Sequence, residues 1–390
     1  MSKKIKVAFF AETLKANYDG AVRTMYQIIR RIPSDQFEFV FICGDQIVEP
    51  LPFKTIVLPS FTLPFNRNYK MTIPFFAQKR LEKALGDFKP DLIHIATPSP
   101  LGHAALRYAK QRQLPVISIY HTHFIAYIDY YLKQMPFLID PIKYGIIKNY
   151  KAFYNQCDVV LAPTLQMIAD LKLLGHDTSH FKIWQRGIDT QLFHPAKKNT
   201  QWLQTQVGNA KPNILFASRL VWEKNLDTLM ELYQLNEQKG SPYNLLIAGD
   251  GVAEEILQLK MPHAYFVGRL SHEQLSILYA SSDIFFFPSI TETYGNVVVE
   301  AMASGLPCVI ANGGGSKSFI QQGKNGFVCE PNNPNDYINR IQQLLTHPKL
   351  YQQFVEEGLA FSKHLNWDSL VEIYFEELKL LVGRTLLQAA

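Results

Sequence analysis

Short apolar runs bounded by turn residues alternate with helix-like segments along the whole chain of 390 residues. Strands buried on both faces read as unbroken apolar runs, so this alternation is typical of parallel sheets covered by helices. A first series of runs predicts strands at 5–10, 37–43, 91–96, 115–120 and 159–162. A second series then predicts strands at 213–217, 244–248, 265–267, 284–287 and 307–311. The pattern predicts an α/β protein of two Rossmann-like domains, whose parallel sheets we expect to face each other across a cleft.

The two series of strands meet between Trp184 and about Gly208, where polar and turn-forming residues interrupt the alternation. We therefore expect an N-terminal domain over residues 1–190 and a C-terminal domain over residues 200–366. This division agrees with the usual size of about 100 to 200 residues per domain. Ligands of such sheets bind beyond the carboxyl ends of the strands, so residues that follow strands are the candidates for chemistry.

Composition narrows the class of protein. With 47% hydrophobic and 19% charged residues, the chain can bury a sizeable core. Its basic start runs directly into the apolar residues 5–10, which predict a first strand and not a signal peptide. No uncharged apolar stretch reaches the roughly 18 residues of a membrane-spanning helix. The cysteines are scattered without metal or disulfide spacing: Cys43, Cys157, Cys308 and Cys329. We expect a cytoplasmic protein.

The net charge of +5 hides an asymmetry, because residues 1–185 hold 23 Lys and Arg against 14 Asp and Glu. Aromatic residues interleave with these cations over residues 61–83 and 120–154. Such a surface suits contact with an anionic membrane. Equally, the aromatic residues can be the core of two helices and the lysines their solvated face.

The strongest chemical signal lies in residues 288–307, directly after a predicted strand. Glu292 falls in the turn, and Gly295 permits close approach of the backbone to a ligand. A helix that starts there directs free N–H groups and its positive end toward an anion. Glu300 follows eight residues later, about two helical turns along. This corner is therefore a candidate for binding phosphate and hydroxyl groups.

Two cations follow the first strand of the second series. Arg219 and Lys224 stand in one loop, where their charges could hold an anionic ligand. Taken alone, such a pair is more often solvated surface. Gly268 ends a later strand, in a type of turn that is common in any α/β domain.

Two residues of the first domain follow strands in the same way. Gly20 lies between the first strand and the first helix, where a glycine lets the backbone approach a ligand. His121 comes just after the strand 115–120, and His123 follows two positions later. A histidine at a strand end can handle protons, although most such residues are structural, and we prefer the structural interpretation for His123.

These motifs resemble the retaining glycosyltransferases of family 4, which have the GT-B fold. The resemblance covers nearly the whole chain and rests on the pair of glutamates eight apart, followed by Ala-Met-Ala-Ser-Gly-Leu-Pro at 301–307. The form Asp-Gly-Ala-Val-Arg-Thr at 19–24 and Tyr-His-Thr at 120–122 is most similar to the sulfolipid synthase and GDP-mannose-dependent α-mannosyltransferase branch. The family usually shows a fuller glycine pair where this chain has Gly20 and Ala21.

The resemblance implies a role for each of these residues. Glu292 and His121 would contact the donor sugar near the reacting centre, and Arg219 and Lys224 would hold the diphosphate. Glu300 would bind the ribose, and Gly268 would form the wall of the base site. Gly20 would contact the donor from the first domain. Backbone contacts to the donor would come from the segment Tyr294, Gly295, Asn296 and Val297. The last helix, at about 368–385, would pack back on the acceptor-side N-terminal domain, and residues 200–366 would bind the nucleotide sugar.

The implied reaction is the transfer of a hexose from a UDP- or GDP-linked sugar, with retention of the anomeric configuration, to a lipid or glycan acceptor of the cell envelope. We expect no metal and no cofactor besides the sugar nucleotide, since the chain contains no Asp-x-Asp motif. The expected partners are the nucleotide sugar, the acceptor and an anionic membrane on its cytoplasmic face, but no nucleic acid.

Two other functions stay open from the sequence. A sugar-nucleotide 2-epimerase would share the fold but transfer no sugar to an acceptor. A non-catalytic protein that binds nucleotide sugars or membrane surfaces would not need the full set of Glu292, Arg219, Lys224 and His121. All four are present, which favours the transferase.

Overall fold

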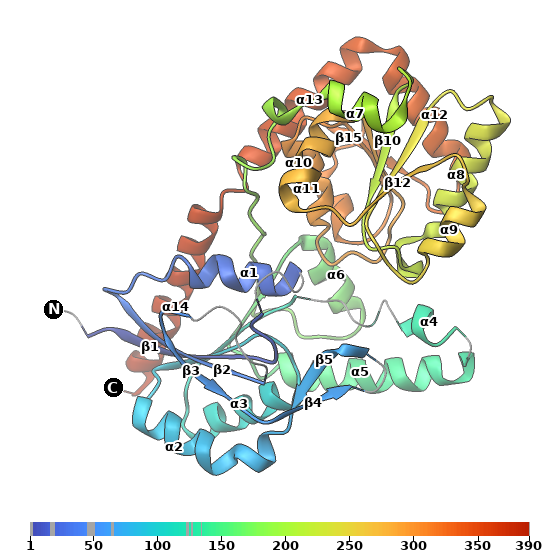
Figure 1. The fold of residues 1–390 in the computed structure, drawn as a ribbon. Coiled ribbons are helices and arrows are strands. Elements are labelled where there is room, and N and C mark those ends of the chain that lie inside the picture. Colours follow the sequence, from blue (N-terminus) through green and yellow to red (C-terminus); the bar gives the residue numbers. More distant parts are fainter. Residues whose placement is uncertain are drawn as a thin grey trace. The chain divides into compact units, whose positions relative to one another are not determined.

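The computed structural model describes residues 3–15, 20–44, 51–63, 66–121, 125, 128–133 and 135–389. The chain divides into two compact units. Unit 1 comprises residues 1–128, 135–185 and 368–390, and unit 2 comprises residues 129–134 and 186–367. Apart from the short segment 129–134, the chain enters unit 2 at Arg186 and returns to unit 1 at Asp368 for its last helix (Figure 1).

Unit 1 is built on a parallel sheet of seven strands in the order β3-β2-β1-β6-β7-β8-β9. The strands are β1 (Ile5–Ala11), β2 (Phe37–Cys43), β3 (Lys54–Val57), β6 (Leu92–Ile95), β7 (Val116–Ile119), β8 (Val159–Ala162) and β9 (Phe181–Ile183). A separate antiparallel hairpin consists of β4 (Ser60–Leu63) and β5 (Asn66–Thr72). The sequence predicted five of these strands and missed β3, β9 and the hairpin.

Helices cover both faces of this sheet. Successive side chains of a strand point to opposite faces, so each strand packs against both layers of helices. Ala8 and Phe10 of β1 pack in one apolar cluster with Leu85, Leu101 and Phe153 from three different helices. On the other face, Phe9 stacks on His94. The helices of unit 1 are α1 (Gly20–Ile29), η1 (Pro74–Ala77), α2 (Gln78–Phe88), α3 (Pro100–Gln111), η3 (Pro136–Leu138), α5 (Ile139–Tyr154), α6 (Leu165–Leu173) and α14 (Trp367–Ala389), and a short α4 (Ile128–Tyr131) spans a boundary between the units.

Helix α14 is fixed to unit 1 by polar contacts as well as by apolar packing. The indole Nε1 of Trp184 donates to the carbonyl of Leu370 at 2.7 Å. The Lys182 ammonium lies 2.7 Å from the Glu377 carboxylate. The hydroxyl of Tyr374 lies 2.9 Å from Nδ1 of His94, in the middle of the sheet. The last helix thus belongs to the core of unit 1.

Unit 2 contains a second parallel sheet, of six strands in the order β12-β11-β10-β13-β14-β15. The strands are β10 (Asn213–Ala217), β11 (Asn244–Ala248), β12 (Tyr265–Gly268), β13 (Ile284–Phe287), β14 (Cys308–Ala311) and β15 (Gly326–Cys329), of which only β15 was not predicted. The helices are η4 (Pro195–Lys197), α7 (Thr200–Val207), η5 (Trp222–Lys224), α8 (Leu226–Gln238), α9 (Glu254–Lys260), α10 (His272–Ser281), α11 (Asn296–Ala303), η6 (Gly315–Phe319), α12 (Pro334–Thr346) and α13 (Pro348–Lys363). Two parallel α/β units confirm the predicted fold class.

The topology of unit 2 brings distant loops together. Strand β10 has β11 on one side and β13 on the other. The chain order of the strands therefore changes direction at β10, which is where ligands of such sheets bind. Arg219 follows β10 and Glu292 follows β13, so neighbouring strands carry both candidate residues to the same edge.

No helix in the part of the chain that the structure describes is long and apolar enough to cross a membrane. All four cysteines are buried and free.

Candidate functional site

A buried ion pair occupies the carboxyl edge of the unit 2 sheet. The Lys224 ammonium, on η5, donates to Oε1 of Glu292, in the loop after β13. Only 5% of the lysine side chain and 17% of the glutamate side chain are exposed. The Ser289 hydroxyl donates to the same carboxylate oxygen at 3.3 Å. A predicted cation and a predicted carboxylate, 68 residues apart, are therefore direct partners.

The surroundings of Glu292 keep it ionised. Burial acts to raise the pKa of its carboxyl group, but the Lys224 ammonium opposes this effect by its charge and its hydrogen bond. The Arg219 charge and the Ser289 hydrogen bond act in the same direction, and the net pKa lies below its ordinary value. Glu292 is thus a carboxylate at neutral pH, already engaged by a cation.

Arg219 has a carboxylate partner of its own. Its Nη2 lies 3.4 Å from Oε1 of Glu223, whose side chain is 5% exposed while that of Arg219 is 63% exposed. The guanidinium therefore reaches toward solvent from a buried anchor. Because each predicted cation is paired with a glutamate, the two ion pairs cancel in formal charge. Glu223 was missed in the sequence, although a carboxylate beside Lys224 and four residues after Arg219 was a visible signal.

Two further hydrogen bonds tie the loop after β10 to the loop after β13. The Thr291 hydroxyl donates to the backbone carbonyl of Glu223 at 2.9 Å. The side-chain amide of Asn225 donates to the carbonyl of Pro288 at 3.2 Å. Buried groups paired in this way rigidify a site, because leaving one of them unpaired is costly. The two loops therefore hold Lys224 and Glu292 in register.

The start of α11 lies in the same corner. Its N-cap residue, Gly295, has φ +92°, and no side chain caps the helix. The first N–H groups of such a helix have no intrahelical acceptor, so with the helix dipole they attract an anion. Asn296 and Val297 form the first turn. The first turn contains no acidic residue, so the helix end supplies positive potential in this corner.

A glycine strip, Gly313–Gly315, backs this corner and was also missed in the sequence. The amide of Gly315 donates to the carbonyl of Glu292 at 2.6 Å. A Cβ on Gly315 would lie 2.2 Å from the carbonyl oxygen of Thr293, and one on Gly295 would lie 2.6 Å from Cβ of Ser316. Side chains at these positions would push the Glu292 loop away from its supports.

Two predicted donor contacts have buried side chains. Tyr294 is 2% exposed, and its hydroxyl donates to the backbone carbonyl of Arg186 at 2.7 Å. Glu300 is 5% exposed and accepts a hydrogen bond of 3.4 Å from the Tyr279 hydroxyl. The Tyr294 side chain is therefore a structural anchor, which leaves its backbone for ligand contact.

The last predicted donor contact of unit 2 is open. Gly268 has φ +67°, and nothing lies within 4 Å of the position that a Cβ would take. Its carbonyl accepts from the amide of Gly249 at 2.8 Å, so the turn is fixed although its outer side is free.

In unit 1, the two predicted residues follow different strands of one sheet. Gly20 is the first residue of α1, and its carbonyl accepts from the Thr24 hydroxyl at 2.8 Å. His121 follows β7 and is 4% exposed. His123 and the residue before Gly20 lie outside the described residues.

A buried carboxylate in unit 1 was not singled out by the sequence. Glu12 follows β1 and is 7% exposed. Its Oε2 accepts from the backbone amide of Thr72 at 2.8 Å and from the Thr72 hydroxyl at 2.5 Å. Its Oε1 accepts from the amide of Leu101, at the start of α3, at 3.3 Å. Glu12 thus joins three segments at the carboxyl edge of the unit 1 sheet.

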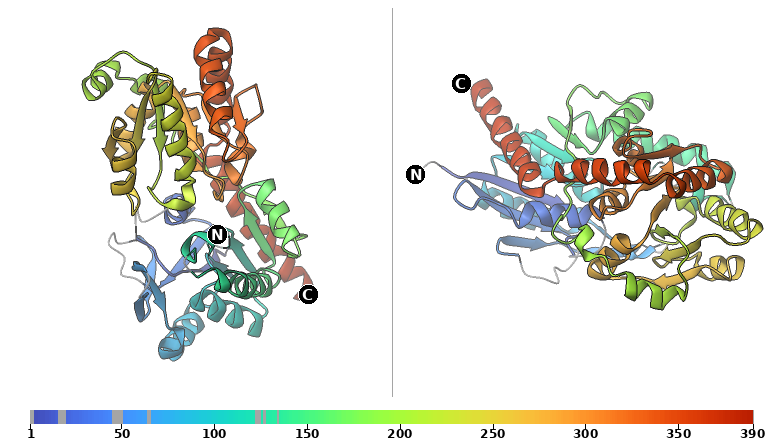
Figure 2. Two further views of the ribbon diagram at one scale, coloured as in Figure 1. Left: turned by 90° about the vertical axis from the view of Figure 1, so that its right-hand side faces the viewer. Right: turned by 90° about the horizontal axis from the view of Figure 1, so that it is seen from above.

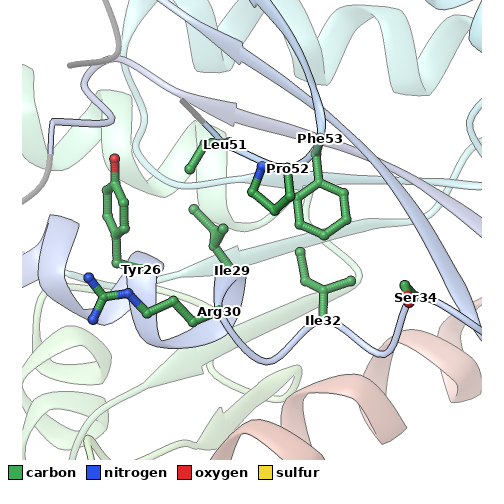
Figure 3. Close-up of a pocket in the computed structure, with 8 residues that line it drawn as sticks. All are labelled: Tyr26, Ile29, Arg30, Ile32, Ser34, Leu51, Pro52 and Phe53. Carbon is green, nitrogen blue, oxygen red and sulfur yellow. The ribbon is translucent and has the colours of Figure 1, made fainter. Parts of the chain in front are cut away.

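A cavity of about 430 Å³ opens at the amino ends of strands β2 and β3, opposite the carboxyl ends that carry the candidate residues (Figure 3). It lies between the last turns of α1 and the segments that lead into β2 and β3. Its lining is mostly apolar, with the guanidinium of Arg30 beside the ring of Tyr26 at 5.9 Å. This cavity lies away from the strand ends that carry the predicted residues. Among the described residues, no group of three or more His, Cys, Asp and Glu side chains could hold a metal ion.

Comparisons with known proteins agree with this architecture. Residues 18–192 match the model of Glycosyltransferase Family 4, and residues 200–360 match that of Glycosyl transferases group 1. The chain is 28% identical over 375 residues to a GDP-mannose-dependent alpha-mannosyltransferase of Corynebacterium glutamicum, covering 94% of this chain and 87% of that protein. It is 30% identical over 356 residues to the sulfoquinovosyl transferase SQD2 of Arabidopsis thaliana, covering 88% of this chain and 68% of that protein.

A solved structure extends the likeness to the whole fold. Sucrose-phosphate synthase from Thermosynechococcus elongatus superposes with a TM-score of 0.76 at 19% identity, covering 99% of this chain and all of that one. The resemblance seen in the glutamate pair and the Tyr-His-Thr signature is therefore confirmed, including the branch that it indicated. The chain belongs to the family 4 glycosyltransferases and has the GT-B fold.

Proposed function

We propose that this glycosyltransferase moves a hexose from a UDP- or GDP-linked sugar to a lipid or glycan acceptor, with retention of the anomeric configuration and without a metal ion. The observation that carries the proposal is the Lys224–Glu292 ion pair beside the uncapped start of α11. A cation, a carboxylate and free N–H groups are there assembled on one edge of one sheet.

The chemistry explains why these groups are needed together. When the glycosidic bond breaks, negative charge develops on the departing diphosphate and positive charge on the sugar. The exposed Arg219 guanidinium, Lys224 and the α11 N-terminus supply fixed positive potential for the first. Glu292, held ionised, supplies negative potential for the second. These fixed charges would do the work that a metal ion does in other transferases.

The partners of Glu292 and Glu300 support retention of the anomeric configuration. A glycosidase that works through two carboxylates needs both of them aimed at the sugar. Here Glu300 is buried against the Tyr279 hydroxyl, and Glu292 is bound to an ammonium that weakens it as a base. Attack by the acceptor on the face that the phosphate leaves, with the phosphate taking the proton, needs neither carboxylate as a base.

From unit 1 we propose His121 as a further participant in transfer.

The surface of unit 1 supports a lipid acceptor. Phe137 on η3 is 75% exposed and Tyr144 on α5 is 69% exposed, and Lys148 and Lys151 are exposed on the same helix. In contrast, Phe153 at the end of α5 is fully buried. The aromatic residues are therefore divided between core and surface, and those at the surface, together with the lysines, suit an anionic membrane. Within the basic aromatic stretch 120–154, residues 122–124, 126–127 and 134 lie outside the described residues.

A nucleotide screen tests the proposed function. UDP, GDP, ADP and their sugar conjugates are added to the chain and the melting temperature is measured, because a ligand that binds only the native state raises it. We expect a response to either the uridine or the guanosine series, and nucleotide release that depends on an added glycolipid or glycan acceptor. Release without transfer would support the 2-epimerase, and no response to any nucleotide would contradict the proposal.

Sedimentation with anionic vesicles tests the membrane contact. Binding should weaken with salt and should fall when Lys148 and Lys151 are both replaced by Gln. The matched control replaces Lys239 and Lys260, two exposed lysines of unit 2, by Gln. Equal binding of both double variants would remove the support that we take from charge.

A further inference from the structure

Helix α14 carries a stripe of exposed apolar residues on the side that faces away from unit 1. Ile373 and Leu380 are each 49% exposed, and Leu387 is 81% exposed. They are spaced by seven residues, so the direction of successive side chains drifts by only about 20°. Single exposed apolar residues are ordinary, but three in one row along a helix form a surface that another helix can contact.

The opposite side of α14 fixes the orientation of this stripe. Val371, Tyr374 and Leu378 are almost fully buried. The Trp184 and Lys182 contacts described above hold the same side of the helix to the sheet. The stripe therefore cannot turn inward. In the right-hand view of Figure 2, the last turns of α14 extend past the strands of unit 1, where a partner could reach them.

One pair of opposite charges on α14 lies symmetrically about Leu380. Glu376 lies four residues before it and Arg384 four residues after it, and both side chains are exposed. Ile373 and Leu387 lie seven residues before and after it. In an antiparallel pair of helices centred on Leu380, residues at equal distance from the centre meet. Ile373 would then face Leu387 of the other helix, and Glu376 would face Arg384.

We propose that a second copy of this chain docks on the stripe, so that two α14 helices pair in antiparallel orientation about a two-fold axis through Leu380. Such an interface is isologous, since each residue contacts its counterpart in both copies. Two apolar contacts, one central leucine pair and two opposite-charge pairs are all formed at once. The pairing closes on itself and gives a dimer and not a filament.

The chemistry of the stripe favours a second copy over other occupants. Glu372 and Glu376 lie beside the first half of the stripe and Lys379 and Arg384 beside the second, so the stripe has no excess of positive charge to attract an anionic membrane. Gly383 lies at the edge of the stripe with open space around it, so the partner helix meets no side chain there. The Glu376 carboxylate lies 2.7 Å from the Lys379 ammonium of its own helix, and Arg384 of the second copy would add a further opposite charge beside it.

Sedimentation equilibrium of the full chain over a range of concentrations tests the proposal. We expect a reversible dimer for the natural chain and a monomer for Leu380→Asp, which places two carboxylates at the centre. Glu376→Arg and Arg384→Glu should each raise the dissociation constant by about tenfold, because two attractive pairs become repulsive. The double variant, Glu376→Arg with Arg384→Glu, should restore dimerisation.

The controls separate loss of pairing from loss of folding. Glu255→Arg, an equal charge reversal on exposed α9, should leave the dissociation constant unchanged. Melting temperatures of all variants should stay near that of the natural chain, since the substituted side chains are exposed. A natural chain that stays monomeric would overturn the proposal, and so would a double variant that dimerises as weakly as the single ones. A monomer whose binding to vesicles is lost in Leu380→Asp would assign the stripe to a membrane instead.

Discussion

Glu12 of unit 1 and Glu292 of unit 2 occupy similar positions and do different things. Glu12 follows β1 of unit 1, and Glu292 follows β13 of unit 2, each at the carboxyl edge of a parallel sheet. Glu12 accepts hydrogen bonds from neutral donors on Thr72 and Leu101. Glu292 is bound to the ammonium of Lys224, beside an uncapped helix end. The partners, and not the location, distinguish them.

The difference shows how the same residue type is assigned to architecture or to chemistry. A carboxylate surrounded by N–H and O–H donors has its hydrogen bonds satisfied and holds segments together. A carboxylate paired with a buried ammonium creates a local field that can act on a ligand. From this comparison we expect Glu12 to support stability, and we propose that Glu292 supports turnover. The first two predictions below test its two sides, and the later ones test a buried polar contact in each unit.

The largest effect is expected from Glu292→Gln, which keeps the shape of the side chain and removes its charge. Turnover should fall by about a thousandfold, as for other preorganised charges near a reacting centre. The Lys224 ammonium then stays buried without its counter-charge, so the melting temperature should also fall, and turnover is measured well below it. The measurement is the rate of sugar transfer at saturating donor, with Glu255→Gln as the control variant. A fully active Glu292→Gln enzyme would show that the catalytic site does not lie in this corner.

Glu12→Ala should have its main effect on stability. It leaves the buried amides of Thr72 and Leu101 without their acceptor, which should lower the free energy of unfolding by about 3 kcal/mol. Chemical denaturation followed by tryptophan fluorescence measures the change. Glu12→Gln retains one acceptor oxygen and should lose less. If Glu12→Ala instead abolished transfer with unchanged stability, the contrast between the two glutamates would be wrong.

A smaller effect concerns His94 in the unit 1 sheet. Burial lowers the pKa of this imidazole to about 3, so it stays neutral in the folded chain while it titrates at about 6.5 when unfolded. The unfolded state binds more protons below that value, and stability should therefore fall as the pH drops from about 6.5 toward 3. At pH 5 the loss should be about 2 kcal/mol relative to pH 7.

The double variant His94→Phe with Tyr374→Phe tests this assignment, because it removes the imidazole together with the hydroxyl that it contacts. The free energy of unfolding is measured from pH 7 to pH 5 for both proteins. The difference between the two pH values should be smaller by about 2 kcal/mol in the variant. Equal pH dependence would show that another group titrates.

The smallest effect is expected from Tyr294→Phe in unit 2. Its hydroxyl donates to the buried carbonyl of Arg186, and losing this bond should cost about 1 kcal/mol. Transfer should continue at the natural rate, because the side chain is buried and only the backbone is available to a ligand. A large fall in turnover with unchanged stability would place the hydroxyl in the reaction and not in the fold.

The sequence predicted the central strands well and the edge strands poorly. Strands β2, β8, β10, β11 and β13 begin and end where the apolar runs predicted. The parallel strands that were missed, β3, β9 and β15, all lie at the edges of their sheets, and of the four edge strands of these two sheets only β12 was predicted. A central strand is buried on both faces and reads as a continuous apolar run, whereas an edge strand is short and partly exposed. Its sequence therefore carries a weaker signal.

The candidate site was predictable where a motif carries it within one segment. Glu292, Gly295 and Glu300 were found because they stand at fixed spacings after an apolar strand, and their resemblance to a family is specific. Glu223 could have been found from its place between two cations. The glycine strip 313–315 carries its role only through the backbone of Glu292 and Thr293 that lies against it. The sequence of the strip by itself gives no indication of this contact.

The sequence by itself determined the fold class, the two series of strands and the family, because periodicity and motif spacing are local properties of the chain. The tertiary structure alone decided that Lys224 binds Glu292, that Glu12 joins Thr72 to Leu101, and that Tyr294 points into the interior. These pairings join residues up to 108 positions apart, the longest being that of the Tyr294 hydroxyl with the carbonyl of Arg186. They depend on which strands are neighbours in a sheet, and strand order is fixed by packing of the whole unit and not by any one segment.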